Sequence, residues 1–282
     1  MYIGAHLKKE SGSLLNTIKI IQDAGGNALQ LFVSNPRSVQ QANIKNYQSL
    51  AKEINEYCTR NNVQLIIHAP YTINLAKELK NDKRIINFNE AYWIQCLLSN
   101  LRVSDVINSV GVVVHVGKYT TNTKEKGLEC MFNAIKYIIG IMNKENISSK
   151  LIIETPAGVG TELLTSVEEF TQFYNKFDEN EKNKLGICLD TAHIWSSGYD
   201  INEYYKTISK TNSKDIVVIH YNNSKKDKGS NVDVHENLFE GKMKLEDMKQ
   251  FLTNLKHKPM IILEKPSDDI KKDIDLIKKT KN

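Results

Sequence analysis

Short apolar runs alternate with longer segments of helical period along almost the whole chain. The runs are rich in Val, Ile and Leu, and turn or helix signals flank each of them, which is typical of strands buried on both faces in a parallel sheet. We expect eight such strands, at residues 2–5, 28–33, 64–68, 112–115, 151–154, 185–190, 216–220 and 260–264.

The segments between the strands repeat their apolar residues at helical spacing. Helices are expected at residues 14–24, 44–60, 91–110, 131–142, 167–174 and 245–255, with a shorter one at 201–209. The length of 282 residues is close to the roughly 250 typical of a closed eight-stranded barrel, and no linker rich in Pro, Gly or Ser interrupts the chain. These features favour an α/β fold in which residues 1–282 form a single (β/α)8 TIM-barrel domain rather than a doubly wound open sheet.

Six of the expected strands end on a side chain that can bind a metal ion. In a barrel of parallel strands the carboxyl ends meet at one mouth, so these side chains converge. Buried acids and imidazoles cost several kcal/mol unless something compensates them, and a divalent cation does so. The sequence therefore predicts a multinuclear metal site at the C-terminal ends of the strands, formed by His68, His115, Glu154, Asp190, His220 and Glu264.

Two alternatives to metal binding stay open for these residues. A single strand-end histidine is more often a hydrogen-bonded core or rim residue than a ligand. Pairing with Lys or Arg would also compensate the acids, although only Glu264 is followed directly by a basic residue, Lys265. Residues that can bind a metal stand at six strand ends, and this repetition favours metal binding over both alternatives.

Two further clusters extend the expected site. In LDTAHIWSSGYD, residues 189–200, Asp190 and His193 are spaced to lie on one side of the turn that leaves the strand. Asp233 and His235 are two residues apart in an extended stretch and project to the same side. Together with His193 they form the three-ligand arrangement of a catalytic zinc site that leaves room for water or substrate. The alternative for Asp233 and His235 is a surface turn.

Composition narrows the class of protein. The four cysteines stand far apart, without the spacing of a zinc ribbon or a disulfide framework, which indicates a reducing, intracellular compartment. We find no signal peptide and no apolar run near the roughly 18 residues of a membrane span, so we expect a soluble protein without a membrane partner.

The formal net charge of +5 is mild and does not by itself indicate nucleic acid. The distribution of the charge is more informative. The loop SKKDKG, residues 224–229, directly follows His220 and so lies on the face of the expected metals. There Lys225 would meet a phosphate backbone. A solvated surface loop is the alternative.

The ordered set of motifs resembles one family, the type 2 apurinic/apyrimidinic endonucleases, or endonuclease IV family. The resemblance runs nearly from end to end, and no single motif would suffice. Its motifs are YIGAH at 2–6, NPR at 35–37, HAPYTINLA at 68–76, ETPAGVGTE at 154–162, CLDTAHIWSSGYD at 188–200 and DVHENLFEG at 233–241.

The resemblance implies three Zn²⁺ ions, with Mn²⁺ possible at one position, and every ligand position of the family is filled. One group is His68, His115 and Glu154; the second is Glu154, as a bridge, with Asp190, His220 and Glu264; the third is His193, Asp233 and His235. Glu154 and Glu264 would then act at the reacting centre. Two cations roughly 3.5 to 4 Å apart can activate a shared hydroxide and polarise a phosphoryl oxygen, so no side chain need be the nucleophile.

The implied reaction is hydrolysis of the phosphodiester 5′ to an abasic site in double-stranded DNA, leaving a 3′-hydroxyl, together with cleaning of blocked 3′ ends. In the family, the loops that hold Arg37 and Tyr71 insert into the DNA stack. The chain departs from the pattern at Thr72, where many members have leucine, so that a smaller and more polar residue takes the place of the leucine wedge. Arg37 paired with a carboxylate and Tyr71 as a half-buried ring are the alternatives. A monomer is expected.

Two rival functions are weighed against this one. Sugar isomerases and epimerases of the same barrel class also place His, Glu and Asp around divalent metals at strand ends, but such a site usually needs two metals. The third group, with His193, argues against that function. A DNA-lesion binding module that has lost catalysis is the other rival, and it need not keep nine costly ligand positions.

Overall fold

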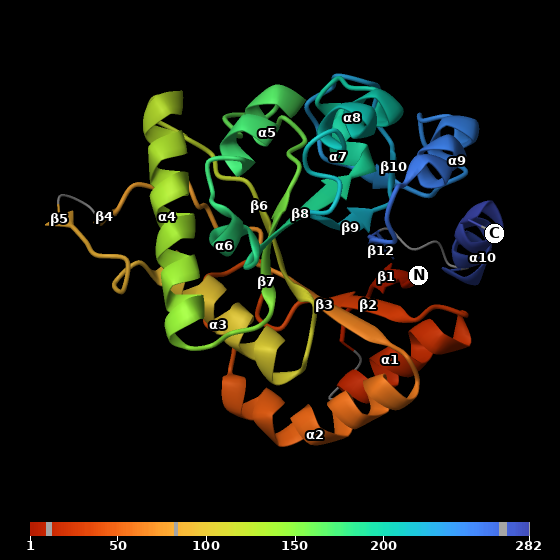
Figure 1. The fold of residues 1–282 in the computed structure, drawn as a ribbon, viewed down its shortest axis with the longest axis horizontal. Helices are drawn as coiled ribbons and strands as arrows, with labels where there is room; N and C mark the ends of the chain where they lie inside the picture. Colours follow the sequence, from red (N-terminus) through yellow and green to blue (C-terminus); the bar gives the residue numbers. More distant parts are fainter. Residues whose placement is uncertain (10–12, 82–83, 265–269, 282) are drawn as a thin grey trace.

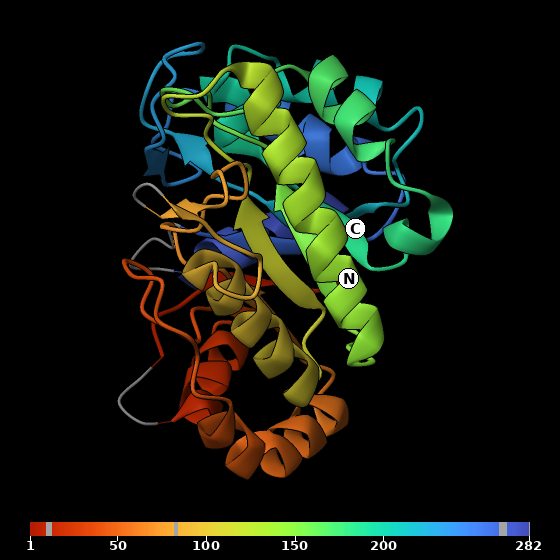
Figure 2. The ribbon, with the colours of Figure 1, turned by 90° about the vertical axis from the view of Figure 1, so that its left-hand side faces the viewer.

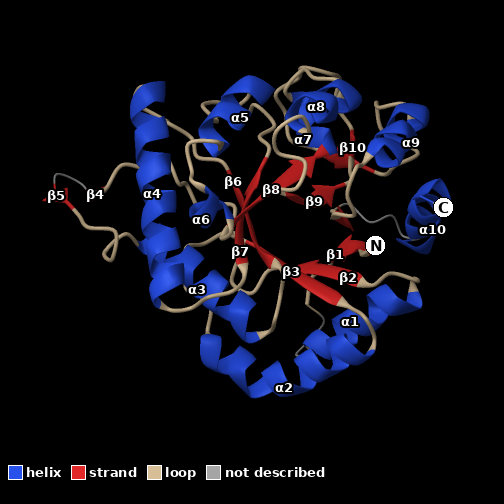
Figure 3. Ribbon diagram, in the orientation of Figure 1, coloured by secondary structure: helices blue, strands red, loops and turns tan. Residues whose placement is uncertain are grey.

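The eight expected strands form one closed barrel. The structure is a computed structural model, and it describes residues 1–9, 13–81, 84–264 and 270–281. All barrel strands run parallel, in the order β1-β12-β9-β8-β7-β6-β3-β2, and Figure 3 shows them as a central ring surrounded by helices. The strands are β1 (Ile3–His6), β2 (Ala28–Leu31), β3 (Gln64–His68), β6 (Gly111–His115), β7 (Lys150–Glu154), β8 (Leu185–Asp190), β9 (Ile216–His220) and β12 (Met260–Leu263). The prediction of a (β/α)8 barrel is confirmed.

Side chains alternate between the inside of the barrel and the layer under the helices. A small apolar cluster fills the inside, and a second, much larger cluster lies between the strands and the helices. The strands are apolar on both faces because both faces are covered. The inner cluster consists of Ala28, Ile66, Val113, Ile152, Cys188, Val218, Met260 and Ile262.

The helices surround this ring (Figure 1). The longest, α4, crosses the outside of the barrel as the yellow-green helix in Figure 2. The helices are α1 (Leu14–Asp23), α2 (Ile44–Arg60), α3 (Tyr92–Val106), α4 (Lys124–Lys144), α5 (Val167–Tyr174), α6 (Glu179–Lys182), α7 (Thr191–Ser196), α8 (Ile201–Ile208), α9 (Leu245–Asn254) and α10 (Ile270–Lys281).

All seven expected helices between strands are present, and two differ clearly from their expected bounds. The segment 91–110 forms a helix only to Val106, because the chain then turns through Asn108 in the left-handed region, with φ of 49°. The segment 131–142 lies inside the longer α4. Its first turns are polar, and the Thr123 side chain caps them by accepting from the amide of Lys126.

Four short elements were not expected from the sequence. They are the helices α6 and α7, and two antiparallel hairpins, β4 (Lys80–Asn81) with β5 (Arg84–Ile85) and β10 (Asn223–Ser224) with β11 (His235–Glu236). In the parts of the chain that the structure describes, no helix is long and apolar enough to cross a membrane.

Candidate metal centre

One polar side chain from each barrel strand lies at its C-terminal end, two residues after an inward-facing position. Because side chains of a strand alternate, each polar residue faces inward like the apolar residue two positions before it. Ile66 therefore precedes His68, and Ile152 precedes Glu154, along their strands. The eight side chains are His6, Gln30, His68, His115, Glu154, Asp190, His220 and Glu264.

Glu154 lies at the centre of the cluster. Its side chain is only 1% exposed, and its Oε2 lies 3.3 Å from Nε2 of His68 and 3.2 Å from Nε2 of His115. Oε1 lies 2.7 Å from Nδ1 of His220. Oε2 has no hydrogen bond to any residue that the structure describes, although it is buried. A buried carboxylate oxygen facing two imidazole nitrogens is an arrangement that a cation would complete.

Hydrogen bonds to backbone carbonyls orient two of the histidines. Nδ1 of His68 lies 2.7 Å from the carbonyl of Ala69, and Nδ1 of His193 lies 2.9 Å from the carbonyl of Thr155. A carbonyl only accepts, so both Nδ1 atoms carry their proton. In the neutral ring the lone pair is then on Nε2, which faces the carboxylates. In metal-binding histidines one ring nitrogen typically donates to a carbonyl in this way, which leaves the other nitrogen for the metal.

A second group forms where β8, β9 and β12 end. Nδ1 of His220 lies 3.2 Å from Oε2 of Glu264 and 3.8 Å from Oδ2 of Asp190. The buried amide of Asn222 links the two acids, donating to Asp190 at 2.7 Å and to Glu264 at 3.2 Å. The amide N–H of Glu264 donates to Oδ1 of Asn222 at 2.8 Å. The acids are thus held apart at fixed positions around one imidazole.

The third group combines α7 with the hairpin β10–β11. Asp190 caps α7 by accepting from the amide of His193 at 2.8 Å, which turns the His193 ring toward the mouth. Oδ1 of Asp233 lies 3.2 Å from Nε2 of His193 and 3.3 Å from Nε2 of His235. Both Nε2 atoms are buried, and neither makes a hydrogen bond within the described residues. His235 begins the strand β11, Asp233 lies in the loop before it, and both side chains face His193 or each other, as their spacing predicts.

The three groups adjoin one another. Donor atoms lie within 4.8 Å of one another in three sets: His68, Glu154 and His220; Asp190, His193 and His235; and Glu154, Asp190, His220 and Glu264. The last set equals one expected group in full. In the other two, His220 stands in place of His115 and Asp190 in place of Asp233. These sets hold seven of the nine predicted ligands. His115 adjoins them at 3.2 Å from Glu154 and Asp233 at 3.2 Å from His193, so the nine form a single cluster whose donors suit divalent cations such as Zn²⁺.

Burial and mutual attraction oppose each other in this cluster. Burial would raise the pKa of Glu154, but attraction to His220 and His115 holds it well below its usual range. Burial raises the pKa of Asp190. Burial would lower the pKa of His193, but Asp190 and Asp233 raise it well above its usual value. Without a cation, imidazolium and carboxylate therefore neutralise each other.

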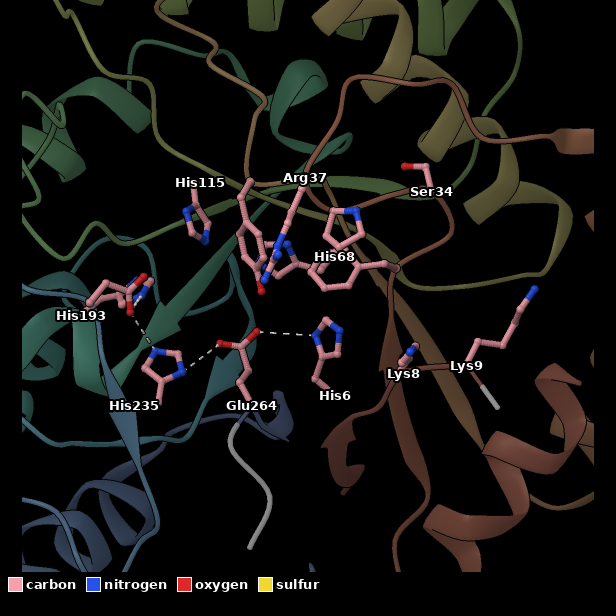
Figure 4. A pocket seen from close by; sticks show the side chains of 14 residues that line it. His6, Lys8, Lys9, Ser34, Arg37, His68, His115, His193, His235 and Glu264 are labelled. Atoms are coloured by element: carbon pink, nitrogen blue, oxygen red, sulfur yellow. Dashed lines mark ion pairs between the residues drawn. The ribbon is translucent and has the colours of Figure 1, made fainter. Parts of the chain in front are cut away.

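A cavity of about 790 Å³ opens above the cluster. Arg37 lines it from the loop after β2 (Figure 4), and Tyr71 lines it from the loop after β3. The amide of Tyr71 donates to the carbonyl of Pro36 at 3.0 Å, so the two loops are joined. Tyr71 is 57% exposed, and its ring packs against Phe32 in a T-shaped contact with ring centroids 5.2 Å apart. Among the described residues Arg37 forms no ion pair, and its exposed guanidinium is available to a ligand.

The other two expected DNA contacts lie outside this cavity. Thr72 and Lys225 are exposed but do not line it. Lys225 lies in the connection from β10 to β11, where its amide donates to the carbonyl of Val234 at 3.0 Å. Sequence reasoning missed several residues that do line the cavity, notably His6, Lys8, Lys9 and Phe32. A signal for His6 was its place at the end of a strand, the criterion applied to the other histidines.

Comparison with known proteins adds to this geometry. The family model described as xylose isomerase-like TIM barrel matches residues 18–280. A probable endonuclease 4 from Mycoplasmopsis pulmonis is 30% identical over 275 residues, which cover 94% of this chain and 92% of that protein. A probable endonuclease 4 from Clostridium botulinum is 30% identical over 293 residues, covering 98% of this chain and 97% of that protein.

Solved structures share the fold. Endonuclease IV from Thermus thermophilus superposes with a TM-score of 0.76 at 22% identity, covering 99% of this chain and 98% of that one. A D-tagatose 3-epimerase-like protein superposes with a TM-score of 0.74 at 19% identity, covering 99% and 97%. At these identities the likeness concerns the barrel alone.

Proposed function

Since this chain belongs to the endonuclease 4 family of xylose isomerase-like TIM barrels, we propose that it is a metal-dependent AP endonuclease of DNA repair. It hydrolyses the phosphodiester 5′ to an abasic site in double-stranded DNA and leaves a 3′-hydroxyl and a 5′-deoxyribose phosphate. It also removes blocking groups from 3′ ends. The observation that carries the proposal is the convergence of three histidine–carboxylate groups below a cavity lined by lysine, arginine and tyrosine.

Three Zn²⁺ ions are proposed, with Mn²⁺ accepted at one position. His68, His115 and Glu154 hold the first, Glu154, Asp190, His220 and Glu264 the second, and His193, Asp233 and His235 the third. Cations bound there supply Lewis-acid polarisation of the phosphodiester and a lowered pKa for the attacking water.

The chain's own residues position the reaction. Glu154 joins the first two groups because its two oxygens face different histidines, His68 and His220. Glu264 is the outermost residue of the second group on the side toward His6 (Figure 4). Both act at the reacting centre. A carboxylate with two oriented oxygens is needed at the shared position, since an amide offers one acceptor and no charge.

Recognition of the missing base falls to the rim of the cavity. Tyr71, exposed yet supported by Phe32, stacks on a base beside the lesion. Arg37 enters the duplex from the adjoining loop, while Thr72 and Lys225 contact the strand outside the cavity. Residues 1–282 act as one domain and as a monomer.

A sugar epimerase is the rival activity, because an epimerase-like protein shares the fold. Two observations favour the endonuclease. Sequence identity to endonuclease 4 reaches 30% along nearly the full length. The third group adds His193, Asp233 and His235 to the two groups that a sugar site usually needs.

Incubation with a labelled duplex that carries one abasic site tests the proposal. We expect a single cut 5′ to the lesion, with an end that a polymerase extends, and loss of cutting after treatment with a strong chelator. An undamaged duplex of the same sequence is the control. Equal cutting of both duplexes, or epimerisation of ketoses without any cutting, would contradict the assignment.

A further inference from the structure

Two of the eight strand-end side chains, His6 and Gln30, belong to none of the metal groups. Gln30 is fully buried between two elements of the site. Its Nε2 donates to Oε1 of Glu264 at 2.8 Å and lies 3.0 Å from Nδ1 of His6. Its Oε1 lies 2.8 Å from Nε2 of His220. One amide thus contacts a predicted ligand acid, a predicted ligand histidine and a histidine on the cavity wall.

Glu264 determines which way this amide faces. A carboxylate only accepts hydrogen bonds, so the group of Gln30 that faces it must be the NH₂. The reversed amide would bring two acceptor oxygens within 2.8 Å of each other. The NH₂ therefore lies between Glu264 and His6, and the carbonyl oxygen faces His220. No choice of tautomer enters this step.

The orientation of the amide sets the protonation of His220. The amide oxygen accepts, so Nε2 of His220 carries a proton. Its Nδ1 lies 2.7 Å from Glu154 and 3.2 Å from Glu264, and because a carboxylate only accepts, Nδ1 also carries a proton as long as no cation is bound. A cation of the second group would displace the proton on Nδ1 and not the one held on Nε2, so the lone pair that it needs would be on the nitrogen that faces it.

The same amide sets the protonation of His6 in the opposite sense. The second hydrogen of the Gln30 NH₂ points to Nδ1 of His6, and two donors cannot face each other at 3.0 Å, so this Nδ1 is an acceptor. The proton of the His6 ring is therefore on Nε2. No residue that the structure describes hydrogen-bonds this Nε2, and the ring lines the cavity. In Figure 4, Lys8 and Lys9 lie beyond His6, on the side away from His193.

We propose that Gln30 is a positioning residue that sets both tautomers at once, and that His6 is a substrate-contacting residue. Gln30 keeps Nδ1 of His220 available to a cation and makes Nε2–H of His6 a neutral donor to a non-bridging phosphate oxygen of the DNA strand. A hydrogen-bond donor at His6 suits a phosphate group, because Lys8 and Lys9 line the same cavity. Glu264 forms the cavity wall on the other side of His6. The role of His6 and the binding of a cation by Nδ1 of His220 rest on the proposed function, whereas the protons that Gln30 places on Nε2 of His220 and Nε2 of His6 do not.

Nitrogen-15 NMR of histidine-labelled protein tests the tautomers without any activity. Two-bond correlations between ring carbon-bound hydrogens and ring nitrogens separate Nδ1–H from Nε2–H. In the metal-free protein His6 should be the Nε2–H form, and in the zinc-loaded protein His220 should keep its Nε2 proton. In Gln30→Met, which has similar size and no amide, His6 should lose this preference. A proton on Nδ1 of His6, or an unchanged preference in Gln30→Met, would overturn the proposal.

Zinc affinity gives a second measurement. Loss of a second-layer partner weakens metal binding by roughly 10- to 100-fold, so competition with a chromophoric chelator should show this loss at one site of Gln30→Met. The matched control is Asn212→Leu, because Asn212 is an equally buried amide hydrogen-bonded to Asn175 and Asp215, before the opposite end of β9. The control should fold less stably but bind zinc normally. Equal zinc affinity in the two variants would overturn the role of Gln30.

Kinetics on abasic duplex test the donor. In His6→Phe, kcat/KM should fall by roughly 10- to 100-fold, as expected for a lost hydrogen bond to a charged oxygen, while zinc content stays unchanged. In His6→Gln, whose amide carries an N–H donor, most of the loss should be recovered. Equal rates in His6→Phe and wild type would overturn the donor role. If the wild-type protein leaves abasic DNA uncut, the proposed function fails, and the NMR result for His6 and Gln30 still decides the tautomers.

Discussion

Glu154→Gln is the sharpest test of the shared ligand. The substitution keeps the shape of the side chain and removes its charge. It replaces the oxygen that faces His68 and His115, or the one that faces His220, by an NH₂ group. In either place the NH₂ group would face the N–H of a charged histidine, donor against donor. An NH₂ group also cannot bind a cation. The change therefore acts on both forms of the protein, metal-free and metal-loaded.

The magnitude follows from burial. Glu154 is 1% exposed, and removing one partner of a buried charge pair costs about 3–5 kcal/mol. At about 2 °C per kcal/mol for a chain of this size, the metal-free variant should melt roughly 6–10 °C lower. In the loaded protein, the first two groups lose their common ligand, so zinc content should fall by about one or two ions. Incision should fall by roughly 1,000-fold or more, since several kcal/mol of charge stabilisation are lost.

Three assays on the same preparation separate these effects: scanning fluorimetry, elemental analysis and single-turnover cutting of abasic duplex. The control is Glu145→Gln, which removes an ion pair to Arg102 at 2.7 Å whose side chains are 32% and 35% exposed. An ion pair at the surface contributes at most about 1 kcal/mol, so this variant should keep its zinc and its activity. Full zinc content together with normal incision in Glu154→Gln would refute the bridging role.

Three further outcomes are expected. Tyr71→Ala should weaken binding to a non-cleavable abasic duplex by roughly 10- to 100-fold at unchanged zinc content, because base stacking on the exposed ring is lost. Fluorescence anisotropy measures this binding. If the variant still discriminates between abasic and intact DNA as the wild type does, Tyr71 has no part in recognition. Burial lowers the pKa of His193, but Asp190 and Asp233 raise it well above 6.5, so zinc must displace protons. Calorimetry in two buffers should show that zinc binding releases protons and that the affinity for zinc rises with pH. In the metal-free protein, the stability that His193 contributes should be lost as the pH rises from 6.5 through the raised pKa. Lys8→Ala with Lys9→Ala should lower the salt dependence of DNA binding by about one charge per lysine, whereas Lys136→Ala on α4 should leave it unchanged.

The barrel could be predicted from the sequence because its strands are apolar on both faces. Every one of the eight runs is a strand, and the bounds differ by at most two residues. The helices were predicted where an apolar stripe faces the barrel. The start of α4 was missed because its first turns, from Lys124, are polar and depend on the cap by Thr123. α7 was missed because it is short, and its formation depends on Asp190, a residue that also belongs to the site.

The predicted ligands could be found because each ends a strand or follows a motif, but their partners could not. Gln30 lies within the run ALQL, where nothing in the local pattern separates it from its apolar neighbours. Its contacts join residues 24, 190 and 234 positions away, and only the closed barrel brings them together. Lys225 shows the opposite case: its charge is evident in the sequence, but the hairpin directs the chain so that the lysine lies outside the cavity.

The barrel strands and the short elements at the mouth, α7 and the hairpin β10–β11, position the site residues in different ways. In the strands, side chains alternate strictly, so a shift of one residue in β7 would turn Glu154 toward the helices and bring an apolar residue into the cluster. The residues of the first two groups therefore all lie at the ends of barrel strands. The third group depends on a short helix and a hairpin: the His193 amide donates to Asp190, the residue that caps α7, and His235 pairs with Ser224. The first two groups thus depend on the barrel strands alone, whereas the third group also needs α7 and the hairpin β10–β11 to be in place.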